Sequence, residues 1–393
     1  MTRIVSFEIE GLSGRRETVR HELNEDINVF WGPNGCGKTS ALKILHCALD
    51  GSVEELKNVA FKSARVNFYS EKYGTVVTRQ IAKSQIKMEP IAELELWDPY
   101  AGEYVTDAGD SVRVSQQPKW KTSPAAAVQT RQFAHSWLPI SRIISNPSRR
   151  KNMAHSSLQD SLDPVPDLEQ QFIQGIHDRW LYWRYAANKS IRTAQDDALA
   201  AVLDVALRGA SKRDSSVTPL DVTQAYDLVK NFFAERANIR MKLPFKNFDE
   251  FRKRYIEDTV LPDIVERLQK VESRIFEILE PQVRLEVMVK DLFSAGRDVE
   301  FSERGVKISV NNEVIPLGNL SSGERQLLVI LLECLGSRRS TVLIDEPELS
   351  MHVAWQNRLI QCIRTINSRS QLVVATHSPE IMAELEDRCI IEL

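Results

Sequence analysis

The sequence predicts an α/β fold: a parallel sheet with helices, a second lobe of mixed strands, and an inserted, compact helical subdomain. Three observations lead to this prediction. A glycine-rich loop at residues 32–39 separates an apolar run from a segment with helical spacing. Two later apolar runs, residues 341–344 and 372–375, end in polar or charged residues, as buried strands of a parallel sheet do. The middle of the chain has helical periodicity instead.

The N-terminal lobe is predicted to consist mainly of strands. Its runs alternate apolar and polar residues and are rich in β-branched and aromatic side chains, which favour the half-buried surface of a sheet. The expected strands are residues 3–9, 17–23, 27–31, 64–69, 75–79 and 93–97. A helix is expected after the glycine-rich loop, where apolar residues recur at helical intervals: Ala41, Leu42, Ile44, Leu45, Ala48 and Leu49.

Helical patterns dominate the centre of the chain. One helical face carries an expected core stripe of Phe172, Ile176, Trp180 and Trp183. A second apolar seam steps by four and three residues, as in a coiled coil: Ile264, Leu268, Val271, Ile275 and Ile278. Thr218 and Pro219 favour a helix start, as a cap and a first helical residue. Because the seam is short, we expect a compact lid or hairpin and not a long arm.

Further strands are expected at residues 299–301, 306–310 and 314–315, just before the C-terminal motifs. Polar stretches at residues 145–167 and 208–219 are predicted loops. These patterns divide the chain into three parts. Residues 1–145 form the first part of a head domain, residues 146–282 a helical insertion, and residues 283–393 the second part of the head.

Composition limits the classes of function. The chain has 393 residues, of which 42% are hydrophobic and 27% charged, values that are ordinary for a soluble globular protein. No apolar run is long enough to span a bilayer, and the N-terminus lacks a signal-peptide core. We therefore expect a cytoplasmic protein without a membrane domain. Its five cysteines lack metal-ligand spacing, which fits a reducing compartment.

The glycine-rich loop matches G-x-x-x-x-G-K-[ST], the Walker A pattern, between a strand and a helix. Glycines let backbone N–H groups turn toward phosphate oxygens at the positive end of a helix. Lys38 can reach the β- and γ-phosphates of a nucleotide, and the Thr39 hydroxyl can bind Mg²⁺. The expected nucleotide-binding residues are Gly32, Pro33, Asn34, Gly35, Cys36, Gly37, Lys38, Thr39 and Ser40.

Three motifs in the C-terminal part complement this loop. The apolar strand at residues 341–344 leads to Asp345 and Glu346, a pair suited to binding Mg²⁺ through its water shell and to polarising a water molecule. Upstream, Ser321, Ser322 and Gly323 open a strongly apolar helix, whose N-terminus is an anion site. Downstream, an apolar strand leads to His377.

The four motifs occur in the order that ABC-type ATPases use for Walker A, signature, Walker B and switch histidine. Residues 346–352, with the sequence EPELSMH, also resemble a segment of prokaryotic OLD-like and RecF-like ATPases. The chain therefore resembles an ABC-class P-loop ATPase of the RecF, SMC-like and OLD group. The resemblance covers about the first 145 residues and the last 110.

The resemblance implies ATP and Mg²⁺ as cofactors, with Thr39 and Asp345 holding the metal. It implies that Glu346 activates water and that Lys38 and His377 act at the γ-phosphate. Nucleotide would lie between the loop of one subunit and the signature of another, in a homodimer or higher homo-oligomer. The signature residues are Ser321, Ser322 and Gly323, and Ser322 replaces the family's usual glycine.

Two further positions stay open on the sequence alone. Arg142 ends a segment that resembles an arginine-terminated strand of related ATPases, which makes it a candidate nucleotide contact. The glutamine of the family's Q-loop cannot be chosen among six candidates: Gln80, Gln85, Gln116, Gln117, Gln129 and Gln132.

The leading functional hypothesis is an ATP hydrolase that controls a separate effector protein, such as a nuclease, in prokaryotic anti-phage defence. The alternatives are a RecF-like, ATP-gated DNA clamp in repair and an ATP-stabilised scaffold with negligible turnover. A net charge of −3 gives no global attraction to nucleic acid, although local basic clusters at residues 142–151 and 236–254 leave such binding open. The chain lacks the Asn-Lys-x-Asp motif, which disfavours a GTPase.

Overall fold

The computed structural model describes residues 2–85, 119–139, 168–208, 220–234, 245–293, 297–303, 305–311, 313–337 and 339–393. Contacts divide the chain into two compact units. The first unit comprises Met1–Arg179 and Met288–Leu393, and the second is the continuous stretch Trp180–Val287. The expected domain boundaries near residues 145 and 282 remain predictions.

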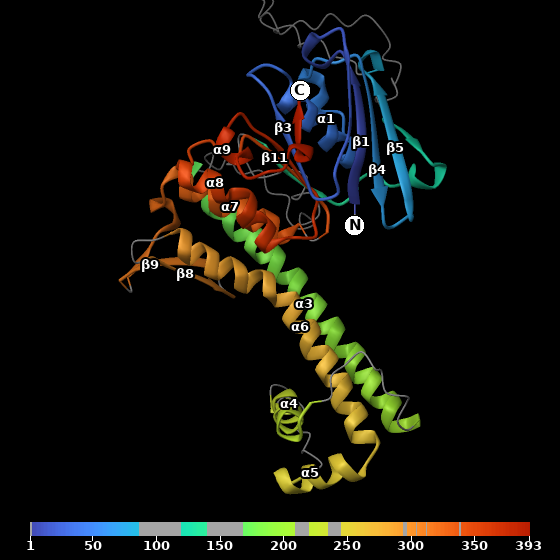
Figure 1. Ribbon diagram of the computed structural model, residues 1–393, viewed down its shortest axis with the longest axis vertical. Coiled ribbons are helices and arrows are strands. Elements are labelled where there is room, and N and C mark those ends of the chain that lie inside the picture. Colours follow the sequence, from blue (N-terminus) through green and yellow to red (C-terminus); the bar gives the residue numbers. More distant parts are fainter. Residues whose placement is uncertain are drawn as a thin grey trace, which may run out of the picture. The chain divides into compact units, whose positions relative to one another are not determined.

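The first unit contains a five-stranded sheet with the order β13-β3-β12-β11-β7. Figure 1 labels two of its strands, β3 and β11. All of its neighbouring strands are parallel. The strands are β3 (Ile27–Trp31), β7 (His135–Leu138), β11 (Thr341–Asp345), β12 (Leu372–Ala375) and β13 (Ile390–Glu392). β11 and β12 are buried at every position, which is why their sequences are almost uniformly apolar. The carboxyl ends of parallel strands share one edge, so the segments after β3, β11 and β12 meet there.

Helix α1 (Lys38–Asp50) packs between this sheet and a second one. The second sheet is antiparallel, with the order β2-β1-β4-β5-β6. Its strands are β1 (Thr2–Glu10), β2 (Thr18–Glu22), β4 (Ser63–Ser70), β5 (Thr75–Ala82) and β6 (Lys121–Ser123). Phe7 of β1 meets Phe30 of β3 edge to face, with ring centroids 5.5 Å apart, so both sheets belong to one hydrophobic core.

Three more helices of the first unit follow the motifs of the C-terminal part. These are α7 (Ser322–Gly336), α8 (Val353–Ile366) and α9 (Pro379–Met382). A small antiparallel sheet precedes α7, with the order β10-β9-β8. Its strands are β8 (Arg297–Ser302), β9 (Gly305–Val310) and β10 (Glu313–Ile315). α7 is buried at most positions, consistent with its almost continuous apolar sequence.

The second unit is helical. α4 (Val222–Ala234) and α5 (Phe248–Glu257) lie wholly within it, whereas α3 (Leu168–Arg208) and α6 (Val260–Leu292) each contribute residues to both units. Phe251 of α5 is fully buried, among Val202 of α3, Val229 of α4 and Leu268 of α6. These helices therefore share one apolar cluster.

Most of the predicted elements are confirmed. β3 and β12 have the predicted bounds, and the other strands predicted in the N-terminal lobe and before α7 differ by one to three residues at an end. Residues 93–97 lie outside the described residues, and β6 and β13 were not predicted. All four side chains of the expected stripe on α3 are buried, as are Leu268, Val271 and Ile278 of the seam on α6. α4 begins at Val222, after the predicted start, and Thr218 and Pro219 lie outside the described residues.

Both long helices exceed what the sequence pattern indicated. α3 has 41 residues and α6 has 33, and their apolar side chains extend beyond the predicted stripe and seam. On α6 the seam continues through Leu285 and Val289, past Pro281. Long polar faces obscured this length, because solvated side chains carry little periodic signal.

Candidate nucleotide site

The glycine-rich loop joins β3 to α1 at the shared edge of the parallel sheet. Gly37, the residue before α1, has φ +107°, a left-handed value that favours glycine. A Cβ atom at this position would lie 2.7 Å from the Ser13 hydroxyl oxygen and 2.9 Å from Leu12 Cγ. Only glycine therefore fits both the backbone angle and the space. As a result the N–H groups of the first turn of α1 end at the loop, where they can meet an anion.

Lys38 is almost completely buried, with 5% of its surface exposed. Its ammonium nitrogen donates to the carbonyl oxygens of Gly32 at 2.8 Å and Pro33 at 3.4 Å, and lies 3.9 Å from a carboxylate oxygen of Glu346. The side chain thus folds back over the loop. A phosphate oxygen entering the loop can replace these carbonyl oxygens as its partner.

Thr39 and Asp345 meet at the same edge. The Thr39 hydroxyl lies 3.1 Å from Oδ1 of Asp345, which ends β11 and has 1% of its surface exposed. A hydroxyl and a carboxylate are the hard oxygen donors that Mg²⁺ prefers. The two residues therefore fit the predicted metal site.

Glu346 follows β11 in a strained conformation. Its φ is +46°, a left-handed value that costs a residue other than glycine about 1–3 kcal/mol. The backbone N–H of Glu346 donates to Ala375 O at 2.8 Å, which holds the residue against the end of β12. Burial raises the pKa of Glu346 to about 7, the neighbouring Glu348 carboxylate adds to the rise, and His377 opposes it. A base with a pKa near neutrality suits proton transfer from water.

His377 lies directly opposite Glu346. Its Nδ1 is hydrogen-bonded to Oε2 of Glu346 and lies 3.3 Å from Oε1 of Glu348. The ligand atoms of the three side chains are all within 4.8 Å of one another. The His377 side chain is 48% exposed, so it can still contact a bound molecule.

The signature residues begin α7. Ser321 caps this helix: its hydroxyl accepts from the Glu324 N–H at 3.3 Å, and the Glu324 carboxylate accepts from the Ser321 N–H at 2.8 Å. Ser321 and Ser322 are exposed, whereas Gly323 is buried. A Cβ atom on Gly323 would lie 2.5 Å from the carbonyl oxygen of Ser350. The signature helix therefore packs closely on the turn after β11.

The structure thus brings together five of the predicted site residues: Lys38, Thr39, Asp345, Glu346 and His377. Arg142, Gln116 and Gln117 lie outside the described residues, as does the side chain of Gln85. Gln129 and Gln132 are exposed, and the Gln80 amide oxygen faces the Arg65 guanidinium group at 2.6 and 2.8 Å. Sequence reasoning gave Glu348 no role in the site. The only signal was a second acid two residues after Glu346.

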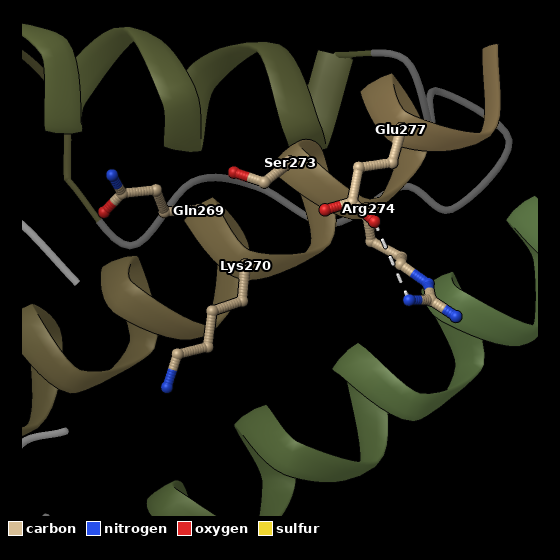
Figure 2. Close-up of a pocket in the computed structure, with 5 residues that line it drawn as sticks. All are labelled: Gln269, Lys270, Ser273, Arg274 and Glu277. Carbon is tan, nitrogen blue, oxygen red and sulfur yellow. Dashed lines mark ion pairs between the residues drawn. The ribbon is translucent and has the colours of Figure 1, made fainter. Parts of the chain in front are cut away.

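A separate hollow of about 230 Å³ belongs to the second unit (Figure 2). It is lined by Gln269, Lys270, Ser273, Arg274 and Glu277, all from α6. Arg274 pairs with Glu277 at 3.8 Å and Lys270 with Glu266 at 3.0 Å, so its charges are matched within the helix. None of these residues belongs to the motifs.

Two family models match the chain. One, described as "AAA domain, putative AbiEii toxin, Type IV TA system", matches residues 120–383, about two thirds of the chain. The chain belongs to this AAA-domain family. A second model, described as an AAA domain, matches residues 6–161. Together the two AAA-domain matches include Walker A, signature, Walker B and His377, and they confirm the expected membership of the P-loop ATPases.

Solved structures similar to this AAA-domain chain include Smc head domains. One from Pyrococcus furiosus, with an extended coiled coil and bound to the C-terminal domain of ScpA, is 15% identical with a TM-score of 0.45. The alignment covers 100% of this chain and 93% of that chain. Another, from Pyrococcus yayanosii with a coiled coil and joint, is 12% identical with a TM-score of 0.45, covering 100% and 95%. Within the described residues, no helix has the length and apolar character that a membrane crossing requires.

Proposed function

We propose that this chain is an ABC-type ATPase that binds and hydrolyses ATP with Mg²⁺ and thereby controls a separate effector protein. The observation that carries this proposal is the convergence of five groups at one edge of the parallel sheet. The ammonium of Lys38, the hydroxyl of Thr39, the carboxylates of Asp345 and Glu346 and the imidazole of His377 all lie there. A strained loop position at Glu346 is also typical of active sites.

Each group has a role in this proposal. Lys38 binds the β- and γ-phosphates and offsets their charge. Mg²⁺, held by Thr39 and the water shell at Asp345, would neutralise charge that develops on the phosphate oxygens. Glu346 accepts a proton from the attacking water, and its raised pKa places it near the working pH. His377, partly exposed beside Glu346, donates to the γ-phosphate.

Hydrolysis is proposed to require two copies of the chain. Ser321 and Ser322 are exposed at the N-terminus of α7, a helix of 15 residues, where a partner's nucleotide can reach them. In this arrangement ATP joins the loop of one subunit to the signature of the other. Assembly then depends on the γ-phosphate, and a homodimer is the smallest assembly that completes the site.

The effector belongs to the same proposal, and we place the system in the cytosol, in prokaryotic anti-phage defence. The family description, which names a toxin of a type IV TA system, supports a two-component arrangement. No observation favours a nuclease over another effector chemistry. DNA clamping in repair is the competing outcome of the test.

The test uses Glu346→Gln, which removes the base and keeps the shape of the side chain. We expect ATP binding to persist while phosphate release falls about 100-fold or more. Glu384→Gln, an exposed acid, is the matched control and should hydrolyse ATP at the wild-type rate. Turnover that is unchanged in Glu346→Gln would overturn the role of this residue.

The same variant identifies the partner. Tagged Glu346→Gln is captured from its native host in ATP and Mg²⁺, and the bound protein and nucleic acid are identified. A stoichiometric protein that is released without ATP supports control of an effector. DNA alone, also released without ATP, would favour the repair clamp. The salt dependence of the DNA affinity would then give the number of phosphate contacts.

A further inference from the structure

The turn after β11, residues 346–351, contains a second buried acid, Glu348, which is 5% exposed. Its Oε1 accepts hydrogen bonds from the Thr376 hydroxyl at 2.5 Å and from the backbone N–H of His377 at 2.9 Å. The His377 Nδ1 lies 3.3 Å from the same oxygen. One carboxylate oxygen therefore fixes both the backbone and the imidazole of His377.

Hydrogen bonding to Thr376 alone does not account for a carboxylate here. A buried carboxylate is costly unless it is paired, and a neutral amide oxygen would accept from a hydroxyl and an N–H equally well. The second oxygen, Oε2, is buried and has no hydrogen-bond partner among the described residues. The Glu348 carboxylate lies beside two titratable groups: the Glu346 carboxylate, which it repels, and the His377 imidazole, whose Nδ1 lies 3.3 Å away. The imidazole is the one of the two that a carboxylate can hold by attraction.

The same turn is also fastened to the signature helix. The Gln326 side chain of α7 donates to Pro347 O at 2.7 Å, and Gly323 packs on Ser350 O. Pro347 directly precedes Glu348. A shift of α7 therefore moves the turn, and the turn carries Glu348 and its two bonds to the histidine loop.

We infer that Glu348 is a positioning residue of the nucleotide site: it holds His377 against Glu346 and links the placement of the signature helix to the histidine loop. This inference rests on the proposed ATP hydrolysis. In the proposed hydrolysis, Glu348 contacts neither ATP nor the attacking water. It acts through His377, and through the turn that Gln326 holds.

The experiment compares Glu348→Ala with Glu348→Gln. The alanine variant loses the acceptor, and we expect kcat for ATP to fall about 100-fold, the scale of a small misplacement of a catalytic group, with KM changing less than about threefold. The glutamine variant keeps an acceptor for the Thr376 hydroxyl and the His377 N–H. Its kcat should therefore be about tenfold higher than that of Glu348→Ala. Glu384→Gln again serves as the exposed control.

Hydrogen exchange supplies a readout that does not need turnover. The His377 amide, bonded to Glu348, should exchange faster in Glu348→Ala and at the wild-type rate in Glu348→Gln. Wild-type kcat in folded Glu348→Ala, or unchanged exchange at His377, would overturn the inference and leave the ATPase intact. A wild-type chain that does not hydrolyse ATP at all would instead overturn the proposed function, and the inference with it.

Discussion

The Thr39 hydroxyl lies 3.1 Å from the Asp345 carboxylate, although the two residues are 306 positions apart in the chain. Thr39 belongs to the first turn of α1, and Asp345 ends β11. The parallel sheet places β3 and β11 on either side of β12, and so brings a hydroxyl from the start of the chain to a carboxylate near its end. A hydroxyl and a carboxylate at this distance fit the proposed Mg²⁺ site.

Thr39→Val should weaken this cation site while keeping the shape of the side chain. Because one oxygen donor is lost, we expect the Mg²⁺ concentration for half-maximal ATP hydrolysis to rise about tenfold or more. The measurement is a Mg²⁺ titration of phosphate release at saturating ATP. Thr365→Val, on the exposed surface of α8, is the control. Identical titration curves for Thr39→Val and wild type would contradict the metal assignment.

Gly323→Ala should disturb the contact between the signature helix and the turn after β11. The added Cβ would lie 2.5 Å from Ser350 O, so one backbone has to shift, at a cost of about 1–3 kcal/mol. Urea unfolding measures the loss, and phosphate release should fall more than ATP affinity. Gly175→Ala is a useful comparison, since the Cβ there meets only the end of the Arg179 side chain at 3.1 Å. A stable, fully active Gly323→Ala protein would contradict the close packing.

Arg79→Met should destabilise the head by about 3 kcal/mol. Arg79 is 3% exposed and donates to four carbonyl oxygens, those of Ala48, Leu49, Thr130 and Arg131, at 2.6 to 3.4 Å. Two of these carbonyls, those of Ala48 and Leu49, lie in the last turn of α1. A positive charge there is attracted to the negative end of the helix dipole. Chemical denaturation checks the prediction. Arg65→Met on the neighbouring strand, where the side chain is exposed, should change the unfolding free energy by less than about 0.5 kcal/mol.

Acid should destabilise the fold through His46. Its Nδ1 lies 2.7 Å from His135 Nε2, its ring stacks on Trp137, and burial and then His135 lower its pKa to about 3. The Glu55 carboxylate lies 3.7 Å from Nε2, but burial outweighs its attraction and His46 is neutral in the fold.

The sign of the pH effect follows from this lowered pKa. The unfolded chain binds a proton at His46 below about pH 6.5 while the folded chain does not, so stability falls as pH drops from 7 toward 3. Between pH 7 and 5 the expected loss is about 2 kcal/mol. Thermal unfolding of wild type and His46→Gln across this range isolates the contribution. Equal slopes for the two proteins would mean that His46 is not buried in its neutral form.

Local motifs were predictable from the sequence because the residues that determine each of them lie within one short stretch of chain. The strand at residues 27–31, the glycine loop and α1 needed only apolar spacing and three glycines, and the structure has all of them. The parallel sheet followed from buried apolar runs. The capping box at Ser321 and Glu324 also lies within four residues, although only its serine was singled out.

Contacts between distant segments were not predictable in this way. The bonds of Glu348 to Thr376 and His377 depend on the register of β11 against β12, which no pattern in either strand specifies. The sequence around Arg79 does not distinguish it from an ordinary arginine of a strand. Its role follows only from the position of β5, which brings its side chain to the carbonyl oxygens at the end of α1. The full lengths of α3 and α6 were not predicted, because long polar faces weaken the helical periodicity of apolar residues.

The position of β3 between β12 and β13 has a consequence for how the chain is made. Ile27 pairs with Leu372, so a ribosome synthesises the strand that carries the phosphate loop long before either of its neighbours. At roughly 5–20 residues per second, that strand waits tens of seconds with both edges unpaired. An unpaired apolar strand invites association with other nascent chains. The nucleotide site is therefore expected to form only after residues 372–392, which supply both neighbours of β3, have been synthesised.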